Sequence, residues 1–504
     1  MKLKILFNDI PEATFRGPKD ISISGICSNS KLITPGDLFI AKNGKTHNGN
    51  KYTPEAITRG AVAILTDLFD PLIKNTIQIV HPDVEGIEGL LAAIYFDNPS
   101  EKLLTVGITG TNGKTTCAYL IKHLFDHMNK PCGLIGSIEY LIGSQHYLAT
   151  RTTPDVVTNH KLLSDMIRHN CNSAVMEVSS HALVQNRVEH INFDIALFTN
   201  LSQDHLDYHR TMEEYCLAKS KLFTSLDSYS RKEKTPPFPI AVINNDCPWT
   251  PTLLSNYKGN RLSYGIDNPS DLQASKLALS SSGSHFDVHY LGKTISFFTP
   301  LIGRHNIYNN LAAISCSLLA GATLTDLSEP LTKFQPVCGR LDYLSNDLNI
   351  HIYVDYAHTP NALENVLKSL RECSIGRIFT VFGCGGDRDS GKRSEMGAIV
   401  EKLSDVSIVT SDNPRSENPL SICQDILEGF IDKSKFIMEI DRKKAIELAI
   451  DLASPHDTIL IAGKGHETYQ VFARKTVPFN DREIASKLCI QKSLGLTDSH
   501  TATL

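Results

Sequence analysis

Apolar and polar positions along this chain fall into short blocks with a regular order. The clearest block spans residues 103–125, where the apolar run "LLTVGIT" leads into "GTNGK" and then "TTCAYLIKHLF". This order predicts a buried strand, a glycine-rich loop and an amphipathic helix. Strand-like and helix-like blocks then alternate to about residue 331, a pattern typical of a mostly parallel sheet covered by helices.

The last third of the chain repeats one pattern four times. The strand-like runs "IHIYV", "RIFTVF", "VSIVT" and "TILIA" end in the polar loops "DYAHTP", "GCGGDRDSGKR", "SDNPR" and "GKGHE". In open α/β sheets, ligands bind outside the carboxyl ends of the strands. We therefore predict that these four loops line one edge and form a binding site.

Two turn-rich segments predict domain boundaries. They are "DNPSEK" at residues 97–102 and "FQPVCGRLD" at residues 334–342. A chain of 504 residues is too long for one core, and a rough prior of one domain per ~150 residues suggests about three. We predict an α/β protein with three domains: an α/β domain over 1–100, a central P-loop ATPase-like parallel-sheet domain over 101–335, and a Rossmann-like α/β domain over 336–504.

Composition and charge narrow the class of protein. The chain is 41% hydrophobic and 21% charged, and its apolar runs are shorter than the ~20 residues that a membrane span needs. The start of the chain lacks the apolar stretch of a signal peptide, and the 12 cysteines form no CxxC pair. We expect a cytoplasmic monomer with reduced thiols and no membrane insertion. The net charge of −5 argues against nucleic-acid binding but says little about small acidic ligands.

The loop "GITGTNGKTT" (residues 107–116) lies where a phosphate-binding loop must lie, between a strand and a helix. Lys114 would reach the terminal phosphates and the Thr115 hydroxyl would ligate Mg²⁺. The spacing departs from the strict P-loop pattern because five residues separate Gly107 from Gly113, so the inner "GTNGKTT" is the part that fits. The residues predicted to bind ATP here are Gly110, Thr111, Asn112, Gly113, Lys114, Thr115 and Thr116.

Three further polar residues lie beside strand ends or polar loops: Glu177, His205 and Lys219. Each has an ordinary explanation when taken alone, as a helix-capping glutamate, a surface histidine and a solvated lysine. Their place among other motifs gives them more weight.

Six motifs occur in one order along the chain: "GTNGKTT", "MEVSSHALVQNR", "NLSQDHLDYH", "LIGRHNIYNNLAA", "VDYAHTPNAL" and "GKGHE". In this order the chain resembles the Mur ligase family, most closely its MurE branch, over nearly its whole length. The resemblance implies an ATP-dependent amide ligase that adds meso-diaminopimelate to UDP-MurNAc-L-Ala-D-Glu through an acyl phosphate, in cytoplasmic peptidoglycan precursor synthesis. It also implies a UDP-muramyl substrate-binding first domain, a central ATP-binding domain and an amino-acid-binding last domain.

The resemblance implies roles for individual residues. The catalytic set is Lys114, Lys219, Glu177 and His205. Mg²⁺ would be held by Thr115, Glu177, His205 and Lys219, the last as a carbamate made from CO₂. The remaining ATP contacts are Asn306, Asn309, Arg340, Asp355 and His358. The UDP-muramyl dipeptide would contact Ser28, Ser30, Lys45, Thr46, His47, Thr152, Thr153, Ser179, Gln185 and Arg187. Diaminopimelate would contact Arg388, Asp412, Asn413, Pro414, Arg415, Gly463 and Glu467.

Charge arguments favour two of these roles. A lysine ammonium beside Mg²⁺ would repel it, whereas a carbamate is anionic and offers the oxygen ligands that a hard cation prefers. A guanidinium at Arg415 matches the distal carboxylate of diaminopimelate, which L-lysine lacks.

The chain departs from the family pattern at two positions. The usual "DSR" reads Asn29-Ser30-Lys31, which puts the uridine contacts in doubt, and Arg151 precedes Thr152 where related chains often have Asn.

Three other functions stay open. The same ligase could add L-lysine, or the chain could be a folylpolyglutamate synthetase-type ligase. It could also be a nucleotide-dependent binding protein without ligase turnover. A folylpolyglutamate synthetase would share the phosphate loop but lack the first-domain segment and "DNPR".

Overall fold

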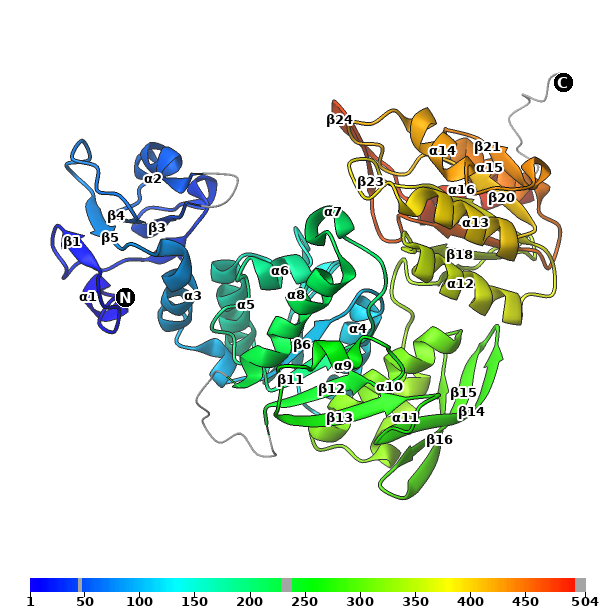
Figure 1. The fold of residues 1–504 in the computed structure, drawn as a ribbon, viewed down its shortest axis with the longest axis horizontal. Helices are drawn as coiled ribbons and strands as arrows, with labels where there is room; N and C mark the ends of the chain where they lie inside the picture. The colour runs from blue at the N-terminus through cyan, green and yellow to red at the C-terminus, as the bar shows by residue number, and fades with distance from the viewer. Residues whose placement is uncertain (44–47, 228–237, 495–504) are drawn as a thin grey trace.

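The computed structural model describes residues 1–43, 48–227 and 238–494, which form three successive α/β bodies (Figure 1). The first body contains a five-stranded sheet of order β1-β5-β4-β3-β2, parallel except for β1. Its strands are β1 (Thr14–Arg16), β2 (Gly25–Cys27), β3 (Asp37–Ala41), β4 (Ala63–Thr66) and β5 (Ile77–Val80). Its helices are α1 (Leu3–Leu6), α2 (Thr53–Thr58) and α3 (Val84–Tyr95), with 3-10 turns at Ser30–Leu32 and Gly49–Tyr52.

The central body is built on an eleven-stranded sheet of order β16-β15-β14-β13-β12-β11-β6-β10-β7-β8-β9. Its middle strands run parallel, and antiparallel strands extend it at both ends. The parallel part contains β6 (Leu104–Thr109), β7 (Cys132–Ile135), β10 (Ser173–Glu177), β11 (Ile195–Phe198), β12 (Ile240–Asn244) and β13 (Asn260–Gly265). The extensions are β8 (Glu139–Ile142), β9 (Gln145–Leu148), β14 (Leu272–Ser280), β15 (Gly283–Tyr290) and β16 (Lys293–Thr299).

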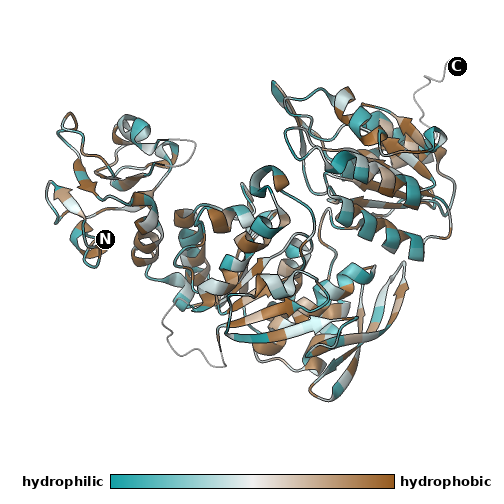
Figure 2. Ribbon diagram, in the orientation of Figure 1, coloured by the Kyte–Doolittle hydropathy of each residue, from teal (hydrophilic) through white to brown (hydrophobic). Residues whose placement is uncertain are grey.

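Helices cover both faces of the central sheet, whose strands are coloured largely as hydrophobic residues (Figure 2). Their buried side chains form two hydrophobic cores. One core involves α4 (Lys114–His127), α10 (Arg304–Leu319) and α11 (Leu324–Thr332). The other involves α5 (Val156–Arg168), α8 (Met212–Thr224) and α9 (Thr250–Leu253). The short helices α6 (Ser180–Val184) and α7 (Leu206–His209) follow β10 and β11. The parallel sheet predicted from the alternating pattern is confirmed.

The last body contains a six-stranded sheet of order β17-β18-β22-β19-β20-β21 and a two-stranded hairpin. The strands are β17 (Asp342–Leu344), β18 (His351–Asp355), β19 (Ile378–Phe382), β20 (Val406–Val409), β21 (Phe436–Met438) and β22 (Thr458–Ala462), and the hairpin pairs β23 (Tyr469–Phe472) with β24 (Lys475–Pro478). Helices α12 (Pro360–Cys373), α13 (Lys392–Leu403) and α14 (Pro419–Leu427) contribute to one core, and α15 (Arg442–Leu452) and α16 (Asp481–Ser493) to the other.

The four strands whose polar loops were predicted to meet are neighbours in this sheet. Strands β18, β22, β19 and β20 are parallel and adjacent in that order. Their carboxyl ends therefore lie along one edge, as the repeated pattern predicts.

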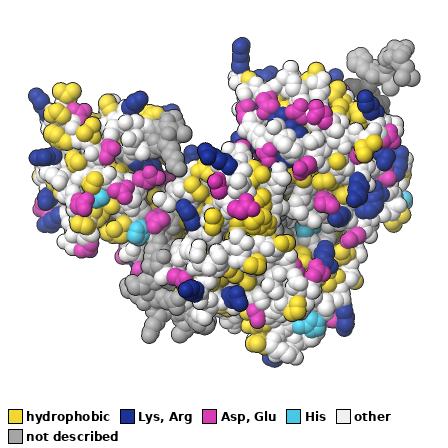
Figure 3. Space-filling model, in the orientation of Figure 1, with side chains coloured by type: hydrophobic (Ala, Val, Ile, Leu, Met, Phe, Trp, Pro, Cys, Tyr) yellow, Lys and Arg dark blue, Asp and Glu magenta, His cyan; other side chains and the backbone are white. Residues whose placement is uncertain are grey.

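The three bodies touch through specific side chains. In the first contact, helix α3 packs on α5, and Val156 and Val157 join the core of the first body. In the second, Asn112 donates to Asn361 (3.2 Å), and Arg340 donates to Thr115 (3.0 Å). Figure 3 shows an open notch between the first and last bodies, above the central one.

Candidate active site

The phosphate-loop glycines are required by their surroundings. Gly110 and Gly113 adopt φ of +148° and +86°, which side-chain-bearing residues rarely adopt. A Cβ on Gly110 would lie 1.9 Å from the Thr199 hydroxyl, and one on Gly113 would lie 2.4 Å from Asn309 Oδ1. Only glycine lets the loop run this close to its neighbours, so the N–H groups that open α4 remain available to an anion.

Lys114 bends back over the same loop. Its Nζ donates to the carbonyls of Gly110 (3.0 Å) and Thr111 (2.9 Å). Burial lowers the pKa of Lys114, and the Glu177 carboxylate acts in the opposite direction. The ammonium is thus held where it can meet phosphate oxygens.

Glu177 lies at the end of β10 and is fully buried. Its Oε2 accepts hydrogen bonds from the hydroxyls of Thr115 (3.0 Å) and Ser137 (3.1 Å), and its Oε1 accepts from the Ser137 N–H (2.9 Å). Arg340, from the chain segment before β17, donates to the same Thr115 hydroxyl. A buried carboxylate beside the P-loop hydroxyl offers the oxygen ligands that Mg²⁺ prefers, so these residues fit the ion.

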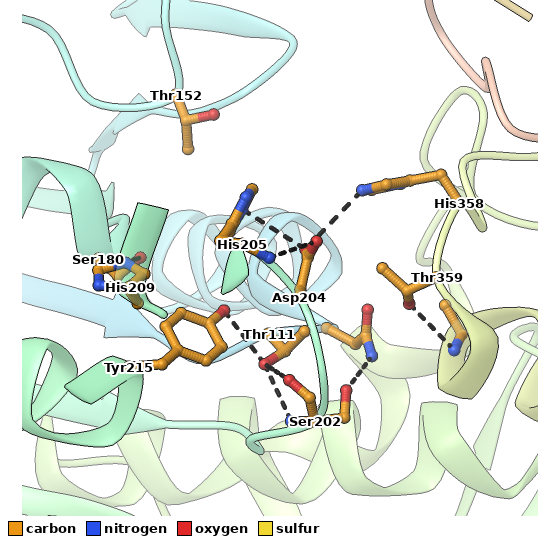
Figure 4. Close-up of polar contacts among 12 residues, drawn as sticks. Thr111, Thr152, Ser180, Ser202, Asp204, His205, His209, Tyr215, His358 and Thr359 are labelled. Carbon is orange, nitrogen blue, oxygen red and sulfur yellow. Dashed lines mark hydrogen bonds and ion pairs between the residues drawn. The ribbon is translucent and has the colours of Figure 1, made fainter. Parts of the chain in front are cut away.

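His205 has a partner that the sequence reading did not identify. Its Nε2 lies 3.4 Å from Asp204 Oδ2, and His358 from the last body approaches the same carboxylate (3.9 Å; Figure 4). Lys392, also from the last body, lies 4.0 Å from Asp204 Oδ1. Burial alone would raise the pKa of Asp204, but His205, His358 and Lys392 lower it overall. Asp204 thus gathers cationic and imidazole groups from two bodies at one point.

Of the four predicted metal residues, all of which the structure describes, only Thr115 and Glu177 contact each other directly. Thr115 bonds to Glu177, whereas His205 lies against Asp204. Within the described ranges, no group of three His, Cys, Asp or Glu side chains has metal-binding spacing. The assignment of His205 as a Mg²⁺ ligand stays a prediction.

Lys219 is buried on α8 beside the phosphate loop. Its Nζ donates to the Gly110 carbonyl (2.9 Å) and lies 4.4 Å from the centre of the Tyr215 ring. Burial lowers the pKa of Lys219 well below its usual value, and the Lys114 ammonium lowers it further. The Tyr215 hydroxyl in turn bonds to Thr111 (3.2 Å; Figure 4).

The predicted nucleotide residues divide into two kinds. Asn309 and Asn306 on α10 are hydrogen-bonded to each other (2.9 Å), and Asn309 lies against Gly113. Arg340 reaches the phosphate loop. Asp355 instead accepts from two backbone N–H groups of its own body, those of Leu341 (2.6 Å) and Ala357 (2.7 Å). Asp355 thus holds the segment that carries Arg340.

The central-body residues predicted to contact the UDP-muramyl dipeptide form one hydrogen-bond network beside Glu177. Thr153 donates to the Glu177 carbonyl (2.8 Å) and accepts from the Ser179 N–H (3.1 Å). Arg187 donates to the Thr153 carbonyl (3.0 Å) and to Gln185 (2.5 Å). Thr152 bonds to Ser137, which also contacts Glu177.

The first-body residues are separate from that network. Ser30 donates to Glu55 (2.7 Å), and Asn29 accepts from the Lys31 N–H (3.1 Å) and so caps a 3-10 turn. Asn29 is therefore suited to the local turn where it departs from the family pattern. Ser28 lies in the same loop, whereas Lys45, Thr46 and His47 lie outside the described residues.

The residues predicted to contact diaminopimelate lie in the loops after β19, β20 and β22, and these loops meet. A Cβ on Gly385 would lie 2.9 Å from Arg415 Nη1 and 3.8 Å from Arg388 Cγ, so both arginines border this glycine. Arg415 Nη1 donates to the Gly386 carbonyl (2.7 Å), and the Arg415 N–H donates to Val471 of the β23–β24 hairpin (3.0 Å). Gly463, with φ of +114°, opens the loop that carries Glu467.

Comparisons with known proteins cover most of the chain. Three descriptions match: the Mur ligase family catalytic domain at residues 22–95, the Mur ligase middle domain at 108–317, and the Mur ligase glutamate ligase domain at 339–465. A protein of Chlamydia caviae, named UDP-N-acetylmuramoyl-L-alanyl-D-glutamate–2,6-diaminopimelate ligase, is 42% identical over 97% of this chain and 99% of its own length. The chain belongs to the Mur ligase family.

Other relatives of this Mur ligase agree. A Clostridium acetobutylicum protein with the same ligase name is 37% identical over 97% of the chain and 99% of its own length. A solved structure with that ligase name has a TM-score of 0.68 at 30% identity and covers 98% of this chain and 99% of its own. MurF from Acinetobacter baumannii, at 17% identity and a TM-score of 0.71 over 97% of this chain and 98% of its own, shares the fold.

Several residues that contact the predicted site residues were not predicted from the sequence. Asp204 directly precedes the predicted His205, and Lys464 lies inside the quoted "GKGHE" motif, so both were adjacent to a signal. Lys392 lies inside the quoted loop "GCGGDRDSGKR", whereas Gln470 lies in less distinctive sequence. Gln470 donates to the Asp412 carbonyl (2.6 Å). No helix of the described residues is long and apolar enough to cross a bilayer.

Proposed function

We propose that this Mur ligase joins meso-diaminopimelate to UDP-MurNAc-L-Ala-D-Glu at the expense of ATP, as a cytoplasmic monomer in peptidoglycan precursor synthesis. The observation that carries the proposal is the environment of Arg415. Its guanidinium is held by backbone carbonyls of Gly386 and Asn413, and no carboxylate in the described ranges forms an ion pair with it. A planar donor fork in this setting suits the distal carboxylate of diaminopimelate.

The chemistry needs an activated carboxylate. ATP transfers its terminal phosphoryl group to the free carboxylate of the dipeptide and forms an acyl phosphate. The amine nitrogen of diaminopimelate then attacks the acyl carbon, the C–N bond forms, and phosphate leaves while the nitrogen loses a proton. Charge builds up on oxygen in both steps, so Lys114 and the N–H groups that open α4 act by electrostatic stabilisation.

Mg²⁺ would neutralise the phosphate oxygens during this chemistry, held by Thr115, Glu177, His205 and a modified Lys219. The Glu177–Thr115 hydrogen bond supports this placement, because both oxygens already lie at the mouth of the phosphate loop. Thr153, Ser179, Gln185 and Arg187 adjoin Glu177 and would hold the dipeptide end of the acceptor.

The properties of Lys219 support the carbamate. A lysine with a strongly lowered pKa has a larger fraction of neutral amine at neutral pH, and this is the form that reacts with CO₂. The N–C bond forms as the neutral amine attacks CO₂ and loses one proton, so the product is an anion. Counted from the ammonium form, two protons leave and an anion replaces a cation. That change would also remove the repulsion between Lys219 and Lys114.

Replacing Lys219 tests this modification. We expect Lys219→Ala to be nearly inactive and to regain part of its turnover when formate or acetate is added, because a small carboxylate can stand in for the carbamate. Lys221→Ala, exposed on the same helix, is the matched control and should keep parental activity. Carbon-13 spectra of the protein under labelled CO₂ that lack a carbamate signal would count against the idea.

A panel of amino acids tests the proposed function directly. The enzyme is incubated with ATP, Mg²⁺ and UDP-MurNAc-L-Ala-D-Glu plus one amino acid at a time, and the product mass is read. We expect product with meso-diaminopimelate and little with L-lysine. Equal product from L-lysine would favour a lysine-adding ligase. ATP hydrolysis that no acceptor stimulates would favour a nucleotide-dependent binding protein.

A structural comparison bears on the alternative that the chain is a folylpolyglutamate synthetase-type ligase. A Mycobacterium tuberculosis folylpolyglutamate synthase structure has a TM-score of 0.60 at 16% identity, covers 94% of its own chain, and covers 80% of this one, against 98% for the diaminopimelate ligase structure. This likeness supports only a shared fold, so a tetrahydrofolate acceptor belongs in the same panel.

A further inference from the structure

Lys464 is a buried cation in the amino-acid region that the proposed chemistry does not use. Its side chain has no exposure, and its Nζ donates to Asn413 Oδ1 (3.1 Å) and Glu467 Oε2 (2.9 Å). Removing an ammonium from water costs several kcal/mol unless partners compensate. A lysine held this way contributes its charge and its hydrogen bonds to the residues around it.

The hydrogen bonds fix the orientation of Asn413. Its Oδ1 accepts from Lys464 and also from the Val471 N–H (3.0 Å), while its Nδ2 donates to Glu467 Oε2 (2.7 Å). Both ends of the amide are therefore committed. Lys464 and Asn413 together direct one oxygen of Glu467 inward, which leaves the other oxygen for a ligand.

Asp412 provides an independent sign of a ligand at this point. Its Oδ1 accepts from the Asn413 N–H (2.6 Å), whereas its Oδ2 is buried and has no hydrogen-bond partner among the described residues. A buried carboxylate oxygen without a partner is costly, and an incoming donor would satisfy it. A Cβ on Gly463 would lie 2.7 Å from this oxygen, so the glycine leaves space beside it.

The formal charges of the two loops balance. Arg415 and Lys464 are cationic, and Asp412 and Glu467 are anionic, so these two loops, which we call the distal pocket, are neutral together. Arg388 belongs to a third loop, after β19, and lies outside this distal pocket. The nearby Arg442 and Asp481 form a fully buried pair of their own (2.8 Å) and add no net charge. The distal end of diaminopimelate carries one ammonium and one carboxylate and is also neutral, whereas the distal end of L-lysine is a cation.

We propose that Lys464 is a positioning residue that sets amino-acid specificity. It orients Asn413 and Glu467, and it offsets the charge of Glu467 so that the pocket accepts a zwitterionic amino-acid end in preference to a cationic one. This inference rests on the proposed function and deepens it. Arg415 recognises the carboxylate, and Lys464 prevents the surrounding acids from turning the pocket into a site for an ammonium alone.

The test compares diaminopimelate with L-lysine in variants of the full-length enzyme. We expect Lys464→Met to lower kcat/KM for diaminopimelate by about tenfold to a hundredfold, mainly through KM, with KM for ATP unchanged. The ratio of kcat/KM for diaminopimelate to that for L-lysine should fall. Lys475→Met, on the exposed strand β24, is the matched control and should leave the ratio unchanged.

Two further variants separate charge from structure. The double variant Lys464→Met/Glu467→Gln restores a neutral pocket and should recover part of the lost ratio. Glu467→Gln alone leaves the pocket cationic and should depress L-lysine more than diaminopimelate, so this single variant tests the inference even if Lys464→Met does not fold.

The outcomes distinguish the two proposals. Suppose that the parent enzyme uses diaminopimelate. If folded Lys464→Met keeps the parental ratio of kcat/KM for diaminopimelate to that for L-lysine, or if this ratio does not rise in Glu467→Gln, the role of Lys464 is overturned. The proposed function then still stands. If the parent enzyme makes no product with diaminopimelate, both proposals fail.

Discussion

Arg415 combines a strained backbone with an unusual set of side-chain contacts. Its φ of 52° lies in the left-handed region, which costs a residue with a side chain roughly 1 kcal/mol or more. The bonds from its N–H to Val471 and from its guanidinium to Gly386 hold it there. Strain kept in place by neighbouring contacts is typical of residues that position a ligand.

Replacing Arg415 should remove selectivity for diaminopimelate. Losing a charged contact of this kind costs roughly 2–5 kcal/mol, or about 30-fold to several-thousand-fold in kcat/KM for diaminopimelate. ATP binding should be unaffected, because Arg415 does not contact the phosphate loop. Steady-state kinetics of Arg415→Ala measure both, with Arg474→Ala in the exposed hairpin turn as control. A parent enzyme that ligates L-lysine as efficiently as diaminopimelate would contradict this role.

Replacing Lys114 should affect the phosphoryl step. Lys114→Ala removes a cation from the phosphates, and this should cost several kcal/mol of transition-state stabilisation, with each ~1.4 kcal/mol worth tenfold in rate. Phosphate release under saturating acceptor measures the loss. The control is Lys122→Ala, also on α4, whose ammonium pairs with Asp126 (2.6 Å) and not with the phosphate loop. Turnover within a few-fold of the parent would show that the loop does not work as assigned.

At the scale of elements, the loop between β19 and α13 has no room for a side chain at Gly385, where it passes Arg415. Gly385→Ala would place a methyl group 2.9 Å from the Arg415 guanidinium and displace it. Crowding of this kind costs about 1–3 kcal/mol, so KM for diaminopimelate should rise by about tenfold while KM for ATP stays the same. Gly391→Ala in the same loop, at φ of −61°, is the control. Equal KM values for diaminopimelate in Gly385→Ala and the parent would disprove the crowding.

The elements that sequence could predict are those specified locally. The phosphate loop follows from an apolar strand, glycines and a helix within one short segment, and the four C-terminal loops follow from a repeated strand pattern. The Arg340–Thr115 contact joins residues 225 positions apart, and the approach of Lys392 to Asp204 likewise depends on tertiary packing. No local pattern carries such contacts.

Charge pairing explains the remaining differences between sequence and structure. His205 was grouped with Glu177 as a metal ligand, yet its nearest carboxylate is the adjacent Asp204. The sequence did not predict a role for Lys464, because a lysine in a polar loop is usually solvated. It is buried beside the β23–β24 hairpin, whose Tyr469 ring lies 5.8 Å from Nζ, and that hairpin was not predicted.

At the scale of the whole molecule, the phosphate loop and the amino-acid loops lie in different bodies. The amine must come within about 3–3.5 Å of the acyl carbon before attack. We therefore propose that the bodies close during turnover, with hinges at residues 97–102 and 334–342, where the sequence places the domain boundaries.

Small-angle scattering measures this closure. The radius of gyration should fall when UDP-MurNAc-L-Ala-D-Glu and a non-hydrolysable ATP analogue are added together. Lys114→Ala lacks the cation that draws the terminal phosphate to the loop, and it is expected to close less under the same conditions. Superimposable curves for the parent enzyme with and without ligands would instead favour a rigid arrangement.

In the linker after α11, two adjacent residues contact two different regions, the amino-acid loops and the phosphate loop. Gly339 packs closely on the "GKGHE" loop, because a Cβ there would lie 2.2 Å from the backbone nitrogen of His466. The next residue, Arg340, donates a hydrogen bond to Thr115 in the phosphate loop. Through such a linker each ligand can alter the other's affinity, and thermodynamic linkage requires the two effects to be equal in size. An inhibitor built for the amino-acid pocket would then gain or lose potency as the cellular ATP concentration changes.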